Sequence, residues 1–272
     1  MKARFFAVLS FMLMFTAAHA QGDLSTISAP GTPNSRGRDI RKECIPTWMF
    51  QATYSFQMPV MDDTKALFGN NHTVGGSVYY KTNRNWLFSV NGNYLSGNKV
   101  KISRRDLFGE ILDLNDEIIT GDGIYGSYAL FERGVHFQLT GGKMFAFRKP
   151  NPNSGIFVQG GLGFLVTWIR TEFGSYASPP KPLNDDYRYG YDRKRGGFAY
   201  SASVGYLFMS STRVFNFSVA VEYVGAITTP MREWDFNLKA KDTKVYNDGY
   251  LGIRAAIYIP TYRRMPADYY YY

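Results

Sequence analysis

Apolar and polar residues alternate along WMFQATYSFQM, residues 48–58. Every second residue from Trp48 to Met58 is apolar, and after Met49 the residues between them are glutamine, threonine or serine. Because a β-strand points successive side chains to opposite faces, this stretch predicts a strand with one apolar and one polar face. Two folds fit such a strand: a soluble sheet that buries its apolar face, or a membrane barrel that turns this face toward lipid.

Seven further stretches repeat the alternation, at residues 73–81, 86–94, 132–147, 156–168, 198–208, 214–223 and 250–259. The connections are alternately long, at 59–71, 95–132, 169–197 and 225–247, and short, at 83–85, 148–155 and 210–213. We read GIYGSYALF, residues 123–131, as loop or as an extension of the fourth strand. An even number of strands with short turns at one end and long loops at the other is typical of outer-membrane barrels. We therefore predict an all-β protein, a transmembrane antiparallel up-and-down β-barrel of eight strands, with a soluble two-sheet sandwich as the alternative.

Charge separates the two faces of these strands. The apolar positions that define the alternation carry no charged residue, whereas the polar faces include Lys81, His136, Glu222 and Arg254. A lysine or arginine that faces lipid at mid-depth costs about 2–4 kcal/mol, so a barrel would place these groups inside. Since eight strands enclose only enough space for side chains, we expect a plugged polar lumen rather than a channel.

The N-terminus has the pattern of a secretory signal peptide. Lys2 and Arg4 precede an apolar run, and Ala18-His19-Ala20 is a small-residue cleavage site before Gln21. We therefore expect residues 1–20 to be a signal peptide, 21–45 a flexible periplasmic lead-in, 46–262 the barrel, and 263–272 a periplasmic tyrosine-rich tail. The expected location is the outer membrane of a Gram-negative bacterium.

Composition agrees with this assignment. The net charge is +9, and removal of Lys2 and Arg4 with the signal peptide leaves 9 − 2 = +7. Cys44 is the single cysteine, which excludes a small domain stapled by internal disulfides. Aromatic residues make up 17% of the chain, and 27 residues are glycine. The basic residues lie in loops and tails rather than on one surface, so no nucleic-acid partner is predicted.

Several segments resemble the small outer-membrane β-barrel proteins of the Bacteroidota, in the broad OmpA/OmpX-like eight-stranded class. These segments are the AHA-Q cleavage site, FERG, KPNPNSG, GYDRKRGGFAYS and RVFNFSVAVEY. The resemblance covers roughly residues 46–262 and implies location and fold without assigning catalytic residues. Some proteins of this group are lone barrels and others accompany larger secretion or assembly complexes, so a structural or interaction role, or that of an accessory subunit, is implied.

The sequence offers few groups for catalysis. His136 shares its predicted lumenal face with Gln138 and Thr140, away from lipid, and no G-x-S-x-G motif is present. We therefore predict no enzyme activity, although an outer-membrane lipid-modifying enzyme and a narrow pore stay open as alternatives. The acidic clusters 113–117 and 184–186 lack the ordered spacing of a calcium loop, so no metal or cofactor is predicted.

Two sets of residues are candidates for contacts. Glu222 and Arg254 lie at similar heights on the polar faces of the last two strands, so we expect a structural ion pair in the lumen, with Tyr258 or His136 nearby. In the third long loop, aromatic and basic residues alternate, and they either contact an anionic sugar, a lipopolysaccharide phosphate or a partner protein, or pack over the strand ends. This possible loop contact patch comprises Tyr187, Arg188, Tyr189, Tyr191, Arg193 and Arg195.

Overall fold

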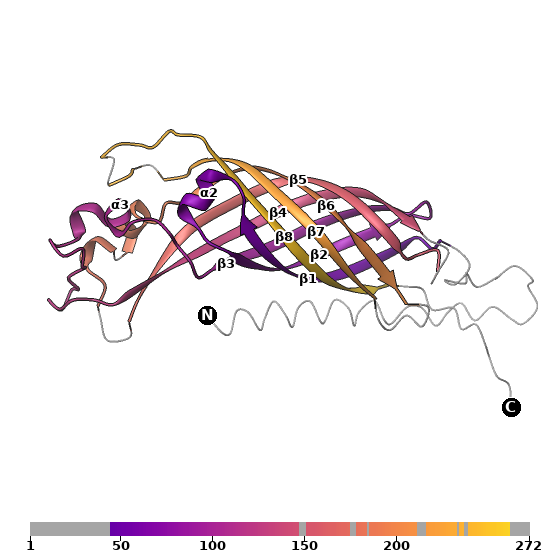
Figure 1. The fold of residues 1–272 in the computed structure, drawn as a ribbon, viewed down its shortest axis with the longest axis horizontal. Coiled ribbons are helices and arrows are strands. Elements are labelled where there is room, and N and C mark those ends of the chain that lie inside the picture. The colour runs from indigo at the N-terminus through magenta and orange to yellow at the C-terminus, as the bar shows by residue number, and fades with distance from the viewer. Residues whose placement is uncertain are drawn as a thin grey trace, which may run out of the picture. The chain divides into compact units, whose positions relative to one another are not determined.

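In the computed structural model, eight strands form a single closed sheet (Figure 1). The structure describes residues 44–146, 151–174, 178–183, 185–210, 216–232, 234–236 and 239–261. The strands are β1 (Thr47–Pro59), β2 (Asn71–Lys81), β3 (Trp86–Gly97), β4 (Tyr128–Ala146), β5 (Gly155–Phe173), β6 (Arg195–Met209), β7 (Asn216–Pro230) and β8 (Tyr246–Pro260). Each strand pairs antiparallel with the next, and β1 pairs with β8 to close the ring. The predicted eight-stranded up-and-down barrel is therefore confirmed.

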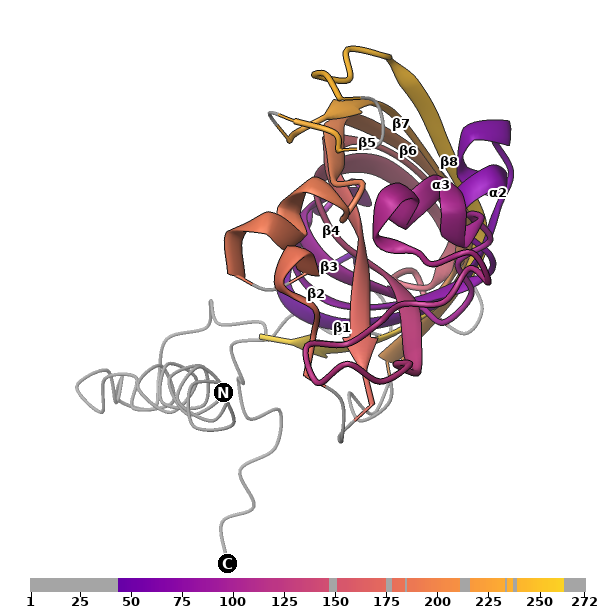
Figure 2. The same cartoon turned by 90° about the vertical axis from the view of Figure 1, so that its left-hand side faces the viewer.

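All short connections lie at one end of the barrel, the turn end, and all long connections lie at the other, the loop end. The loops contain the helices α2 (Asp62–Leu67) and α3 (Arg104–Phe108) and the 3-10 helices η1 (Gly109–Ile111), η2 (Lys181–Leu183) and η3 (Asp185–Gly190). Figure 2 shows the barrel from the loop end, with these short helices gathered around its mouth. Within the described part of the chain, no helix is both long enough and apolar enough to cross a membrane.

The strand β1 settles which face is buried. Its side chains alternate strictly, with Trp48 56% exposed and Tyr54 49% exposed, while Gln51 and Ser55 are 5% and 3% exposed. The apolar residues are therefore outside and the polar residues inside, which is the inverse of a soluble sandwich. The sandwich alternative is wrong.

One lysine corrects the expectation of an uncharged outer face. Lys143 on β4 points outward beside Trp86 of β3, with its ammonium nitrogen 5.2 Å from the ring centroid. Both residues lie near the turn end, where a long side chain reaches the aqueous boundary of a membrane. Lys143 therefore marks the edge of the apolar outer face on the side of the turn end.

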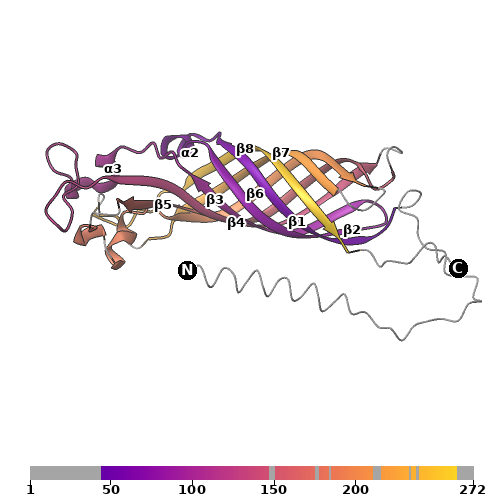
Figure 3. The ribbon, with the colours of Figure 1, turned by 90° about the horizontal axis from the view of Figure 1, so that it is seen from below.

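The strands extend farther toward the loop end than the alternation predicts. Strand β4 begins at Tyr128, β5 continues to Phe173, and β6 begins at Arg195, so the loops are shorter than expected (Figure 3). The four last residues of GIYGSYALF belong to β4, as the extension interpretation required, whereas Tyr125 forms only an isolated bridge with Ile119. Backbone pairing continues above the apolar wall because hydrogen bonds between strands do not depend on side-chain polarity.

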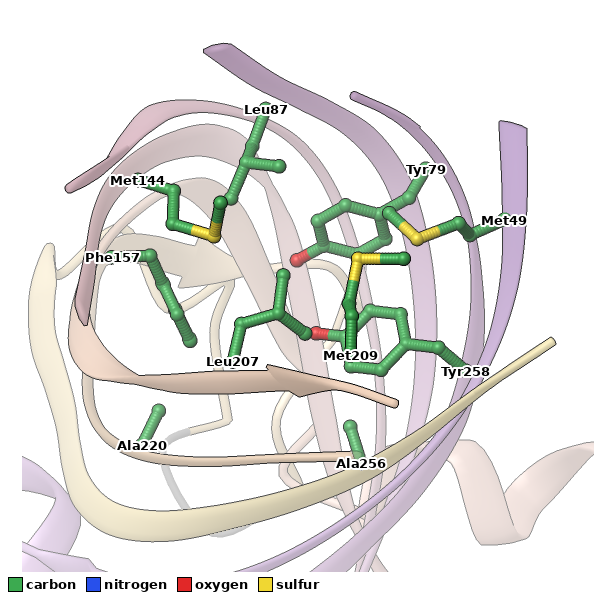
Figure 4. Close-up of a cluster of buried hydrophobic side chains, with 10 residues drawn as sticks. All are labelled: Met49, Tyr79, Leu87, Met144, Phe157, Leu207, Met209, Ala220, Ala256 and Tyr258. Atoms are coloured by element: carbon green, nitrogen blue, oxygen red, sulfur yellow. The ribbon is translucent and has the colours of Figure 1, made fainter. Parts of the chain in front are cut away.

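An apolar layer fills the barrel at the turn end (Figure 4). Phe157, Leu207 and Met144 point inward from neighbouring strands, and the rings of Tyr79 and Tyr258 meet edge to face with centroids 5.6 Å apart. The layer comprises Met49, Tyr79, Leu87, Met144, Phe157, Leu207, Met209, Ala220, Ala256 and Tyr258, all at most 4% exposed. This packing closes the turn end of the lumen.

Three expected segments fall outside the described residues. They are the signal peptide 1–20, most of the lead-in 21–45, and the tyrosine-rich tail 263–272. They stay predictions.

Candidate functional site

The middle of the lumen contains the expected charged residues in contact. Nη1 of Arg254 lies 3.0 Å from Oε1 of Glu222, and both side chains are less than 10% exposed. The guanidinium also donates from Nη2 to Asn91 Oδ1 at 3.3 Å, and Gln138 Nε2 donates to the same carboxylate oxygen of Glu222 at 3.4 Å. A buried pair with such additional partners is held in a defined geometry.

His136 lies on the lumenal face, as the sequence indicated, and is 5% exposed. It borders a cavity of about 10 Å³ together with Glu222, Gln57 and Tyr250. This volume holds one water molecule at most. Nε2 of His136 has no hydrogen-bond partner among the described residues, so the histidine is enclosed rather than poised in a substrate pocket.

The other two predicted lumenal residues lie closer to the turn end. The hydroxyl of Tyr258 accepts a hydrogen bond from Gln51 Nε2 at 2.9 Å and lies 3.0 Å from Ser218 Oγ. Lys81 is fully buried, and its ammonium donates to Asn153 Oδ1 at 2.8 Å and to the carbonyl oxygen of Ile45 at 3.3 Å. The lysine thus ties the chain that leads into β1 to the turn before β5.

Two buried acids near the loop end were missed by the sequence analysis. Asp248 pairs with Arg195 at 2.9 Å and accepts hydrogen bonds from Thr64 of α2 and Thr228 of β7. Glu132 is fully buried and accepts a hydrogen bond from the hydroxyl of Tyr250 at 2.8 Å. Both acids share the parity of known lumenal positions on their strands. Glu132 is the first residue of its expected strand, whereas the expected last strand began two residues after Asp248.

The long loops pack together into a cap with its own apolar core. Its central side chains come from three loops and from the upper part of β5, and they are at most 8% exposed. They are Phe68, Leu107, Phe108, Ile118, Ile169 and Leu183. We call this assembly of residues 60–70, 98–127, 174, 178–183 and 185–194 the loop cap.

Hydrogen bonds fix the loops of the cap to one another. The carboxylate of Asp122 accepts from the backbone N–H of Ser178 at 2.9 Å and from its hydroxyl at 3.2 Å. The guanidinium of Arg193 donates to the carbonyl oxygen of Asp106 at 2.6 Å, and Arg105 pairs with Asp116. The cap is therefore cross-linked between loops that are distant in sequence.

The acidic stretch 113–117 forms a tight hairpin tip. The carboxylate of Asp113 accepts hydrogen bonds from the backbone N–H groups of Glu117 and Asn115, and these donors lower the pKa of Asp113. Leu112 and Ile118 form a bridge behind the tip, where Leu114 is 98% exposed. No group of acids, histidines or cysteines in the described part of the chain is arranged to hold a metal ion.

The residues of the possible loop contact patch lie in different surroundings in the structure. Tyr187, Arg188 and Tyr189 are exposed, with the guanidinium of Arg188 5.0 Å from the ring centroid of Tyr189. The ring of Tyr191 stacks on Phe236 with centroids 5.0 Å apart and is partly buried in the cap. Tyr191 therefore packs against the aromatic residues Phe236 and Phe108, and the contact role of the patch stays a prediction.

Arg195 does not belong to an exposed patch. It is 3% exposed, and its side chain turns into the lumen because Arg195 is the first residue of β6 and has lumenal parity. Arg193, two residues earlier, remains at the surface and lines a groove in the cap.

This groove has a volume of about 730 Å³ and lies between the first three loops and Phe236. Its floor is apolar, with Ala66, Leu67 and Ile102, and its charged lining comprises Lys101, Arg105, Arg193 and Asp106. Because Asp116 neutralises Arg105, Lys101 and Arg193 against Asp106 leave the groove with one excess positive charge.

No protein-family model and no curated protein matches the sequence. The chain is similar to the solved structure of Ail, the attachment invasion locus protein of Yersinia pestis, at 13% identity over 78% of this chain and 97% of that chain, with a TM-score of 0.40. It is also similar to Ail in complex with the heparin analogue sucrose octasulfate, at 10% identity, the same coverage and a TM-score of 0.36.

A third similar structure is Neisserial surface protein A, at 12% identity over 77% of this chain and 96% of that chain, with a TM-score of 0.34. At these scores the likenesses carry no argument, and the assignment of the fold rests on the strand pairing. The Bacteroidota origin implied by the sequence segments stays a prediction.

Proposed function

We propose that this protein is an integral outer-membrane β-barrel with a closed interior, and that it acts by contacts of its loop cap. The height of the apolar outer wall supports the membrane placement. On β4, the outward charges Arg133 and Lys143 lie ten positions apart. At about 3.3 Å per residue and a strand tilt of about 40°, the distance between them is about 25 Å along the barrel axis. This is the height of the lipid-facing band of outer-membrane barrels.

The filled lumen is the observation that favours a function through contacts of the loop cap over transport through the barrel. The apolar layer occupies the turn end, the Glu222–Arg254 pair crosses the middle, and the mid-barrel cavity of about 10 Å³ holds at most one water molecule. Purified protein in planar bilayers should therefore produce no conductance steps. Regular single-channel steps would favour the narrow pore.

Cell fractionation tests the placement itself. The protein should be recovered with outer membranes and should migrate at different positions on a gel before and after heating, because a closed barrel resists detergent until it is heated. Recovery in the soluble periplasm after osmotic shock would contradict the proposal.

The positive charge of the groove supports a role of the cap in binding an anionic surface ligand, such as a sulfated or phosphorylated polysaccharide. Electrostatic attraction and a few placed donors suit a polyanion, whose charges bind several cations at once. The exposed Tyr187 and Tyr189 would also suit a protein partner, as an accessory subunit of a secretion or assembly complex would need.

A charge reversal in the groove tests this ligand class. The Lys101→Glu variant should bind immobilised heparin more weakly than the unchanged protein, and raised salt should weaken both interactions. Arg84→Glu, in the turn at the opposite end, is the matched control and should leave binding unchanged. Equal losses in the two variants would indicate attraction by net charge alone and would contradict a site in the groove.

A further inference from the structure

A row of polar side chains crosses the outer wall where the apolar band ends. Cross-strand pairing places His72 of β2 next to Ser96 of β3, and Ser96 next to Arg133 of β4. Tyr54 of β1 reaches the row from one side, with its hydroxyl 2.7 Å from Nδ1 of His72. All four have the outward parity of their strands, and we call them the polar row.

Arg133 carries the charge of the polar row, and part of its guanidinium is not engaged in hydrogen bonds with the described residues. Its Nη1 donates to Ser96 Oγ at 2.8 Å and to the carbonyl oxygen of Glu132 at 2.9 Å. Nε and Nη2 make no hydrogen bond with a described residue, and no described carboxylate pairs with this guanidinium. The guanidinium lies over the ring of Phe131, 4.9 Å from the ring centroid, and this contact holds the guanidinium in place.

A neighbouring outward-facing arginine, in contrast, is neutralised by an acid of the protein. Arg170 of β5 also faces outward, beside Phe131, and pairs with Glu172 at 2.8 Å. Arg133 lies one step nearer the apolar band, opposite Trp168, and has no such acid. An outward guanidinium at this depth that no protein acid neutralises is available to an anion from the membrane side, and such an anion lowers the cost of a charge near the lipid.

The histidine adds a second donor. When the hydroxyl of Tyr54 donates to Nδ1 of His72, the neutral ring carries its proton on Nε2, which is free to donate outward. Strands are about 4.8 Å apart, so His72 and Arg133 are separated by about 10 Å with Ser96 between them. Guanidinium, hydroxyl and imidazole groups at this spacing suit the oxygens of a phosphorylated sugar headgroup.

We propose that the polar row binds a phosphate of a membrane glycolipid of the lipopolysaccharide kind, in the leaflet at the loop end. The proposal rests on the membrane placement given above. The lipid's acyl chains would lie along the apolar wall below, against Tyr94, Val135 and Val166 on β3, β4 and β5. The site is separate from the groove of the loop cap, because it faces the bilayer and not the medium.

Lipid binding to the full mature protein tests this site. Native mass spectrometry in detergent should show that diphosphorylated lipid A binds to the protein and that dephosphorylated lipid A binds more weakly. Arg133→Gln should weaken binding about tenfold or more, the loss expected for a charge-assisted hydrogen bond. Arg133→Lys should restore part of the affinity, since lysine keeps the charge without the fork.

Arg170→Gln is the matched control on the same wall and should bind lipid A as the unchanged protein does, because its guanidinium already has a partner. His72→Gln should give a smaller loss than Arg133→Gln and provides a second variant if Arg133→Gln folds poorly. Equal binding of dephosphorylated lipid A, or equal losses for Arg133→Gln and Arg170→Gln, would overturn the proposal. Phosphatidylglycerol that binds as tightly as lipid A would overturn the assignment to a glycolipid.

Fractionation separates this inference from the proposed function. A protein recovered in the outer membrane whose lipid A binding is insensitive to Arg133→Gln would overturn the phosphate site alone. A protein recovered in the soluble periplasm would overturn both.

Discussion

The two halves of the lumen are filled by different chemistry. At the turn end, Leu87, Met144, Phe157 and Leu207 pack as an apolar layer that a soluble protein would also recognise as a core. From the middle upward, ion pairs and buried carboxylates share the space with a smaller apolar cluster of Leu95, Leu165, Ala199, Ala226 and Tyr250. The apolar layer at the turn end should therefore tolerate substitutions by other apolar side chains of similar size. The ion pairs toward the loop end stabilise the barrel only when both charged residues are present.

Breaking the central ion pair should have the largest effect. Arg254→Met should lower the free energy of unfolding by about 3–5 kcal/mol, because Glu222 would remain buried without its cation. The double variant Arg254→Met/Glu222→Leu should recover much of that loss. Urea unfolding in detergent micelles measures both. A double variant as unstable as the sum of the single variants would show that the two charges are not coupled.

A truncation in the apolar layer should cost somewhat less. Leu207→Ala should lower the unfolding free energy by about 3 kcal/mol, since it removes buried methyl groups and leaves a cavity. The size-preserving change Leu207→Met should cost less than about 1.5 kcal/mol, whereas the equally size-preserving Glu222→Gln should cost more. Similar losses for these last two variants would remove the distinction between the two halves.

The upper ion pair should show a smaller and more local effect. Arg195→Met should cost about 1–3 kcal/mol, because Asp248 keeps the hydrogen bonds of Thr64 and Thr228. Since Thr64 belongs to α2, limited proteolysis should cut the first loop faster in this variant. Unchanged cleavage there, with a global loss of stability, would show that the pair does not anchor the cap.

The pH dependence of the loop cap should be the smallest effect. The backbone N–H and hydroxyl of Ser178 lower the pKa of Asp122 below its usual value. A depressed carboxyl pKa adds stability above the pKa of the unfolded chain and loses it as the pH falls through the lowered folded value. The link between the two loops should thus weaken only in acid, below about pH 4. Proteolysis of the loops at pH 3 and pH 7 measures this, and Asp122→Ala should remove the difference.

Alternation sufficed to predict what the membrane imposes. Lipid requires apolar side chains on the outer face, so the alternation predicts β1 and its neighbours as strands over the height of the bilayer. Above it, Arg133, Arg170 and Glu172 face outward on strands that continue to pair. The alternation therefore did not predict where these strands end, and the lumenal positions of Arg195 and Asp248 beyond the expected ends were missed.

The loop cap was beyond prediction for a different reason. Its contacts join residues far apart in sequence, such as Asp122 and Ser178 or Arg193 and Asp106, and they follow no period. The same holds for the groove, whose lining comes from several loops and becomes one surface only when they are packed. The Glu222–Arg254 contact was accessible because both residues lie on adjacent strands of known parity.

The hairpin tip around Asp113 has a consequence for how this protein can change over generations. The backbone hydrogen bonds of Asp113 shape the turn, while the side chain of Leu114 touches almost nothing. Substitutions or short insertions at the tip therefore leave the packed interior of the cap in place. The sequence at such a position can therefore diverge while the barrel beneath it stays constant.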